Sequence, residues 1–139
     1  MSLVDARLEC SSAQALTASA DSTNVIDLTG TALQVGAGRP LYMHFNVTVA
    51  ADFTTGDETY SFGVATGAAT SLGTVLASRA IVATTLVAGY NFSIAVPSTG
   101  VLRYIGAEYV LAGTSPTITV DAYLSDQEVY SWQSYADAI

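Results

Sequence analysis

The sequence contains no lysine, and its only basic residues are four arginines that lie far apart along the chain (Arg7, Arg39, Arg79 and Arg103). Proteins that bind nucleic acid or an anionic membrane surface usually cluster Lys and Arg on one face, because neutralising the phosphates supplies much of the affinity. Four scattered arginines cannot form such a patch. We therefore expect neither nucleic acid nor a membrane among the partners of this protein.

Cysteine is almost as scarce. Cys10 is the only one, so the chain can form neither an internal disulfide nor a cysteine-rich metal site. No run reaches the roughly 20 apolar residues that a membrane-spanning helix needs. The first residues also lack the apolar stretch of a signal peptide, because Arg7 and Glu9 interrupt it. These absences predict a soluble protein that is synthesised in the cytoplasm.

Apolar and acidic residues are plentiful. Half of the 139 residues are hydrophobic and only 12% are charged, with 12 acidic groups against four basic ones and a formal net charge of −8. This composition is too apolar for intrinsic disorder. A chain of this length is most simply one domain that buries about two thirds of its unfolded surface.

A period of two in hydrophobicity predicts β-strands. Between residues 41 and 49 every odd position is apolar, so these side chains would line one face of a sheet. The same alternation predicts strands over 59–65, 90–96 and 117–124. Residues 102–111 are apolar on both faces, which predicts a strand buried on both sides. Weaker strand signals cover 24–28, 31–35, 74–76 and 80–86.

Short strands that are separated by turn-forming clusters about every ten residues are typical of an antiparallel sandwich. We predict an all-β fold, an antiparallel jelly-roll sandwich of about eight strands. An immunoglobulin-like sandwich is the alternative, but the cysteine pair of that fold is missing. Three segments are expected: an N-terminal arm over 1–22, the jelly-roll domain over 23–124, and an aromatic C-terminal tail over 125–139 that packs on the domain or on a partner.

No residue pattern predicts an active site. His44 is the only histidine, it lies in the middle of a predicted strand, and no acidic residue is within seven positions of it. A Gly-x-Ser-x-Gly nucleophile motif is absent. Cys10 is expected to be a small buried side chain rather than a nucleophile. We therefore expect no enzyme, no catalytic residue and no cofactor.

Two further patterns have a structural and a functional interpretation. Asp52, Asp57 and Glu58 surround a glycine turn, and Ca²⁺ takes oxygen ligands from such loops. The regular spacing of an EF-hand loop is missing, so a solvated hairpin loop is favoured and no metal site is predicted.

Tyrosines could also stack on carbohydrate, but aromatic residues are ordinary strand formers. The tyrosines in predicted strands are Tyr42, Tyr60, Tyr90, Tyr104, Tyr109 and Tyr123.

Three segments in the same order carry a resemblance to a known family. They are the stretch from Ser11 to Leu28, the stretch from Arg39 to Val49 (Arg-Pro-Leu-Tyr-Met-His-Phe-Asn-Val-Thr-Val), and Val75-Leu-Ala-Ser. Together they resemble the capsid cement (decoration) proteins of tailed bacteriophages, most closely that of a Bordetella phage. The resemblance implies a jelly-roll domain that binds the outer surface of an icosahedral head and staples neighbouring major capsid protein subunits. It also implies a homo-oligomer, most simply a dimer. It implies no catalytic residues.

The arm over 1–22 and the tail over 125–139 lie outside the strand pattern and carry apolar side chains, so we expect them to contact other subunits or the capsid. The alternative is that they cover sheet edges of their own domain. Arginine is singled out because its guanidinium binds carboxylates in a bidentate manner. The candidate interface residues are Leu3, Val4, Arg7 and Leu8 in the arm, Arg39 before a predicted strand, and Tyr130, Trp132 and Tyr135 in the tail.

Two other functions fit the same fold. Jelly rolls also serve as carbohydrate-binding modules and as parts of tail fibres, and this class would need a solvent-exposed row of tyrosines. A sugar hydrolase comes third, since it would need two carboxylates that face each other across a cleft.

Overall fold

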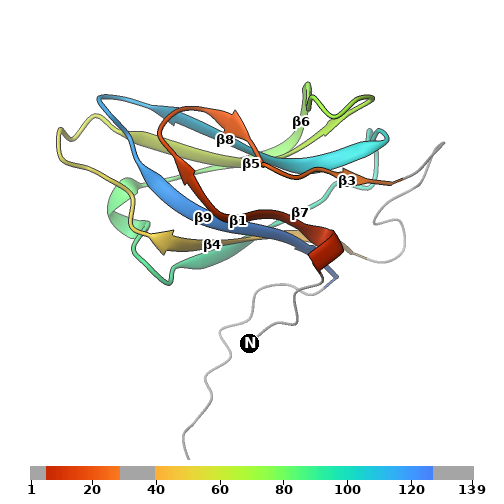
Figure 1. The fold of residues 1–139 in the computed structure, drawn as a ribbon, viewed down its shortest axis with the longest axis horizontal. Helices are drawn as coiled ribbons and strands as arrows, with labels where there is room; N and C mark the ends of the chain where they lie inside the picture. The colour runs from red at the N-terminus through yellow and green to blue at the C-terminus, as the bar shows by residue number, and fades with distance from the viewer. Residues whose placement is uncertain (1–5, 29–39, 127–139) are drawn as a thin grey trace, which may run out of the picture.

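The computed structural model describes residues 6–28 and 40–126, which form two antiparallel sheets packed face to face (Figure 1). The first sheet has the strand order β1-β9-β4-β7, and the second has the order β2-β8-β5-β6, with β3 also paired to β8. The elements are η1 (Ala6–Leu8), β1 (Glu9–Leu16), β2 (Ala20–Asp21), β3 (Ile26–Asp27), β4 (Tyr42–Val49), β5 (Thr59–Gly67), β6 (Thr74–Ile81), η2 (Ala83–Thr85), β7 (Asn91–Ala95), β8 (Tyr104–Ala112) and β9 (Ile118–Ser125). No helix in these ranges is long and apolar enough to cross a membrane.

The connectivity is that of a jelly roll. Strands β2 and β3 lie one after the other along β8, so they act as a single interrupted strand. All the other connections pass from one sheet to the other, except the turn between β5 and β6. Eight strand positions in two sheets with these crossings are the jelly-roll arrangement. The predicted all-β antiparallel sandwich is confirmed.

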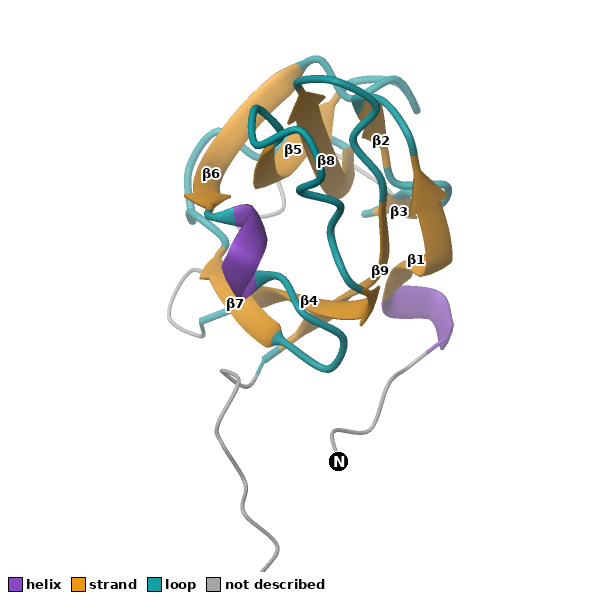
Figure 2. Ribbon diagram, turned by 90° about the vertical axis from the view of Figure 1, so that its left-hand side faces the viewer, coloured by secondary structure: helices purple, strands orange, loops and turns teal. Residues whose placement is uncertain are grey.

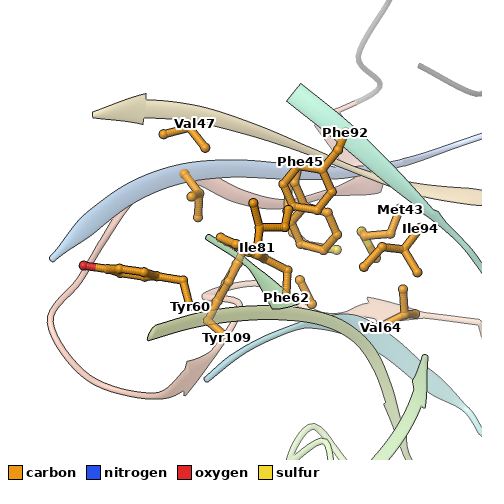
Figure 3. Close-up of a cluster of buried hydrophobic side chains, with 14 of the residues drawn as sticks. Met43, Phe45, Val47, Tyr60, Phe62, Val64, Ile81, Phe92, Ile94 and Tyr109 are labelled. Carbon is orange, nitrogen blue, oxygen red and sulfur yellow. The ribbon is translucent and has the colours of Figure 1, made fainter. Parts of the chain in front are cut away.

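An aromatic cluster holds the two sheets together in the core (Figure 3). Phe45 of β4 stacks on Phe92 of β7 with ring centroids 5.0 Å apart. From the other sheet, Phe62 of β5 lies 5.6 Å from Phe45, and Tyr109 of β8 meets Phe62 edge-on at 6.0 Å. Offset and edge-to-face ring pairs of this kind stabilise a core beyond the area that they bury.

Burial along β8 and β9 shows where the sequence pattern predicted the faces correctly. Every second residue of β9 is buried, from Ile118 to Leu124, as the alternation indicated. The expectation that the strand over 102–111 is buried on both sides is only half right. Leu72 and Val25 cover the outer face at Gly106, but Val110 is exposed on the same face of the strand.

The predicted N-terminal arm is wrong for residues 9–16 and 20–21, because these form β1 and β2 of the sandwich. β1 escapes the period-two pattern for a physical reason. Its pairing with β9 shifts register twice, on either side of Ser11, and Ala13 adopts a left-handed φ of 44°. Each bulge moves the following side chains to the other face, so the alternation breaks down.

The second correction concerns β6. The sequence predicted two strands, over 74–76 and 80–86, where the structure has one strand from Thr74 to Ile81 followed by η2. The polar pair Ser78-Arg79 interrupts the apolar pattern because β6 is an edge strand whose side chains are mostly exposed. The strand predicted over 31–35 lies outside the described residues.

Candidate docking surface

Seven large apolar side chains are exposed in the described part of the chain, and four of them belong to one end of the sandwich. These four are Val49 (58% exposed), Phe53 (43%), Val82 (66%) and Val87 (54%). They come from the end of β4, the β4–β5 connection and the two turns around η2. These segments lie together at the left of Figure 1 and face the viewer in Figure 2. We call the end of the sandwich that carries these four side chains the loop end.

Backbone hydrogen bonds hold the segments of the loop end in place. The amide of Ala51 donates to the carbonyl of Leu86 at 2.9 Å, and the amide of Gly89 donates to the carbonyl of Val47 at 2.8 Å. Leu86 is fully buried beneath the surface and anchors η2 to the core. A site built on segments that are fixed in this way loses little conformational entropy when a partner binds.

The β8–β9 turn supports the loop end from the other side. The amide of Asp52 donates to the carbonyl of Thr117 at 2.9 Å, and the hydroxyl of Tyr60 donates to the carbonyl of Asp52 at 2.7 Å. Gly113 packs so closely on the start of β5 that a Cβ there would lie 2.5 Å from the carbonyl oxygen of Asp57. Three chain connections therefore form one preorganised unit.

The acidic side chains of the β4–β5 connection accept hydrogen bonds from the turns around them, and one of them is buried. Glu58 is buried, and its carboxylate accepts hydrogen bonds from the Thr55 hydroxyl, the Thr55 amide at 3.1 Å and the Gly56 amide at 2.9 Å. Asp57 accepts from the Thr114 amide at 3.1 Å and the Thr114 hydroxyl at 2.9 Å. Hydrogen bonds from Thr55 lower the pKa of Glu58 below its ordinary value, and those from Thr55 and Thr114 lower the pKa of Asp57.

This arrangement corrects one interpretation of the sequence. The segment from Asp52 to Glu58 is not a hairpin loop, because β4 and β5 lie in different sheets. Its carboxylates serve as acceptors for the turns around them. Within the ranges that the structure describes, no three His, Cys, Asp or Glu residues are placed to hold a metal ion.

The side chains with the most versatile chemistry are buried. His44 is 3% exposed and stacks on Tyr123 of the neighbouring strand, with ring centroids 5.0 Å apart. Cys10 is 1% exposed, and burial raises the pKa of its thiol to about 12. At neutral pH such a thiol is protonated and a poor nucleophile. The expected small buried side chain at Cys10 is confirmed.

The tyrosines do not form an exposed row. Tyr60 and Tyr109 are buried, and the four others in or beside strands are half-buried (Tyr42, Tyr90, Tyr104 and Tyr123). The hydroxyl of Tyr109 shares a 2.7 Å hydrogen bond with the hydroxyl of Ser11, which satisfies it inside the sandwich. The feature that would favour carbohydrate stacking is therefore missing from these six residues.

The structure describes two of the candidate interface residues from the sequence. Arg7 and Leu8 belong to η1, at the end of the molecule away from the loop end (Figure 1). Leu8 is half-buried against the core, so it stabilises its own domain, and Arg7 is exposed. Leu3, Val4, Arg39, Tyr130, Trp132 and Tyr135 lie outside the described residues, and their role as contacts stays a prediction.

Sequence reasoning missed the loop end. Its apolar residues stand singly among polar ones, and a single apolar residue in a loop is as often a core anchor as an exposed contact. Leu86 and Val87 illustrate this, because they are adjacent in sequence but only Val87 is exposed. Whether such a residue is a core anchor or an exposed contact is decided only where the β4–β5, β6–β7 and β8–β9 connections meet in the folded protein.

Comparison with known proteins gives a match to a family model. A search among curated proteins finds none. The model of the Bbp16 family matches residues 10–124, which cover both sheets and the loop end. The name of that family indicates a Bordetella phage protein. Because the match spans most of the chain, this protein belongs to the Bbp16 family.

Proposed function

We propose that this protein is a structural component of the virion that binds the outer surface of a phage head and cements neighbouring major capsid protein subunits. The observation that carries the proposal is the loop end, where hydrogen-bonded turns carry four exposed apolar side chains, in a member of a phage protein family. The major capsid protein is the proposed partner, with a second copy of this chain as a further one. The protein acts outside the shell and needs no cofactor.

The loop end has the properties of a protein-binding surface. Soluble monomers seldom gather large apolar side chains on one exposed surface unless another molecule covers them. Fixed turns present these side chains, so binding requires little rearrangement. Exposed carboxylates such as Asp57 lie beside them, and the described part of the loop end carries no basic residue. A matching shell surface would be apolar with a rim of hydrogen-bond donors or basic groups.

The energetic contribution of one such contact is modest, which suits a protein that binds in many copies. Fully burying a valine or phenylalanine side chain contributes about 1.5–3 kcal/mol, so a half-exposed one contributes roughly 1 kcal/mol. Four such side chains give about 4 kcal/mol before other contacts. Each bound copy that bridges two shell subunits adds this energy to the shell, and the total grows with the number of copies.

The proposal is tested by binding to phage heads that lack this protein, prepared from the phage that encodes it. Wild-type protein is expected to co-sediment with the heads to saturation and to raise the temperature at which they release DNA. The double variant Val82→Ser/Val87→Ser removes two of the exposed side chains of the loop end. At about 1 kcal/mol each, this change should weaken binding roughly thirtyfold.

A matched control substitutes two exposed apolar residues at the opposite end of the sandwich, Val75→Ser/Leu102→Ser, and is expected to bind as the wild type does. Failure of the wild-type protein to sediment with heads would contradict the proposed function. Co-sedimentation with polysaccharide instead would favour the carbohydrate-binding alternative. Equal binding by both double variants would remove the loop end as the contact surface.

A further inference from the structure

Tyr60 is a buried residue of β5 whose hydroxyl points away from the aromatic cluster of the core. It is 2% exposed, and Figure 3 shows its ring with the oxygen turned away from Phe62 and Tyr109. The hydroxyl lies 2.7 Å from the carbonyl oxygen of Asp52, and 3.2 Å from both the amide nitrogen and the carbonyl oxygen of Thr117. A side chain of the core therefore reaches two of the connections that form the loop end.

These contacts form a closed set of hydrogen bonds. The hydroxyl has one proton, which goes to the nearer acceptor, the Asp52 carbonyl, and its oxygen accepts the Thr117 amide. The Asp52 amide in turn donates to the Thr117 carbonyl at 2.9 Å. Burial raises the pKa of Tyr60, so the hydroxyl keeps the proton that it donates. Asp52 and Thr117 are thus joined both directly and through Tyr60.

The dipeptide Ala51-Asp52 is where the three connections of the loop end meet. The amide of Ala51 donates to the Leu86 carbonyl of the β6–β7 connection at 2.9 Å, and the next amide donates to the β8–β9 turn. The Asp52 carbonyl belongs to the peptide group that continues into Phe53, and a peptide group is planar. The hydrogen bond from Tyr60 therefore also orients the backbone that presents Phe53, which is 43% exposed.

A second side-chain link between the β4–β5 connection and the β8–β9 turn lies at the surface. Asp57 accepts hydrogen bonds from Thr114, and both residues are exposed. Water can replace either partner there, so this link holds the two segments less firmly than one made by a buried group. The hydroxyl of Tyr60 belongs to a ring that the core fixes. It is the firmer of the two links.

We propose that Tyr60 is a positioning residue of the loop end, whose hydroxyl holds Asp52 against Thr117 and so fixes Phe53 in the orientation that the shell subunit binds. This role rests on the proposed function for the identity of the partner and adds which buried group keeps the binding surface in shape. Tyr60 acts through Phe53 and does not itself touch the partner. A surface that is fixed before binding loses less conformational entropy when the partner docks.

Tyr109 provides a matched comparison within the same sheet. It is also buried, and its hydroxyl forms a hydrogen bond of the same length, 2.7 Å, but to the Ser11 hydroxyl of β1. Neither Tyr109 nor Ser11 belongs to the three connections of the loop end. Replacing either tyrosine by phenylalanine removes one hydroxyl and keeps the ring. A hydroxyl that only stabilises the fold would have the same effect on binding at both positions.

Binding to phage heads that lack this protein separates the two roles. Tyr60→Phe should weaken binding roughly five- to tenfold, the loss expected for one hydrogen bond, and Tyr109→Phe should change it less than about twofold. Thermal melts should show that both variants fold and lose similar stability. Equal binding by the two variants would overturn the positioning role while the proposed function stood. Failure of the wild-type protein to bind would instead contradict the proposed function.

Hydrogen exchange in the free protein tests the positioning directly. The Thr117 amide donates to the Tyr60 hydroxyl, so it should be protected in the wild type and should exchange at least about tenfold faster in Tyr60→Phe. Its exchange should be unchanged in Tyr109→Phe, and Val120 in the middle of β9 should be unchanged in both variants. An unprotected Thr117 amide in the wild-type protein would overturn the proposal without any variant.

A double-mutant cycle tests whether Tyr60 acts through Phe53. In a Phe53→Ala background the side chain to be positioned is gone, so adding Tyr60→Phe should weaken head binding by less than about twofold. Tyr109→Phe in the same background serves as the control. If Tyr60→Phe caused its full loss of binding in the Phe53→Ala background, the hydroxyl would not act through Phe53 and the proposal would be overturned.

Discussion

At the scale of single residues, Gly113 allows the β8–β9 turn to pack against the start of β5 beneath the loop end. It has a φ of 102°, a backbone conformation that residues with a Cβ rarely adopt. A Cβ there would also lie 2.6 Å from the Cα of Glu58, too close for any real contact. Conformation and packing therefore both require glycine where the β8–β9 turn meets β5.

Gly113→Ala should lower the free energy of unfolding by about 2 kcal/mol or more, because the positive φ alone costs roughly 1–2 kcal/mol and the clash adds to it. Urea denaturation followed by circular dichroism measures the effect. Gly73→Ala is the matched control, since a Cβ at Gly73 meets no atom within 4 Å and its φ is not positive. Similar losses of stability in both variants would contradict this account.

At the scale of elements, the β4–β5 connection owes part of its shape to a buried carboxylate. Glu58 accepts three hydrogen bonds from Thr55 and Gly56, and Gly56 reaches the required turn with a φ of 80°. The connection is therefore held by a charge whose ionised form these donors stabilise. Its order should depend on pH.

The lowered pKa of Glu58 sets the sign of this dependence. Folding favours the ionised form, so the contribution to stability is complete above the ordinary glutamate pKa of roughly 4.3 and is lost as the pH falls through that value to the lowered one. Glu58→Gln should therefore melt at a lower temperature than wild type at pH 7, and the gap should shrink toward pH 3. Glu9→Gln removes the same charge far from this connection and should show no such convergence. A gap that stays constant with pH would contradict the assignment.

Element by element, the sequence predicted the regular strands and missed the irregular ones. β4 and β9 were found because their side chains keep to alternate faces over their whole length, from Met43 to Val47 and from Ile118 to Leu124. β1 was missed because its bulges break the alternation, and β6 was divided because an edge strand has no continuous apolar face. The loop end was not predictable either, since the connections that carry Phe53 and Val82 are joined only in the fold, by the hydrogen bond from the Ala51 amide to the Leu86 carbonyl.

At the scale of the whole molecule, the two sheets share one core. Phe45 and Phe92 come from the first sheet, and Phe62 and Tyr109 come from the second, with all four rings in contact (Figure 3). Neither sheet can bury its inner face without the other. This shared core also keeps the loop end in a fixed position, because Val47 of β4 and Leu86 beneath the loop end belong to it.

Phe62→Ala should therefore destabilise both sheets together. Removing a buried phenylalanine costs about 3–5 kcal/mol, a large part of the 5–15 kcal/mol that stabilises a typical domain. Urea unfolding followed by far-ultraviolet and near-ultraviolet circular dichroism should give coincident transitions at a lower midpoint, and hydrogen exchange should accelerate equally in β8 and β9. Phe53→Ala removes an exposed phenylalanine of the loop end and should change stability by no more than about 0.5 kcal/mol. Faster exchange in β8 alone would mean that the sheets unfold separately, and the loop end could then no longer be treated as one rigid surface.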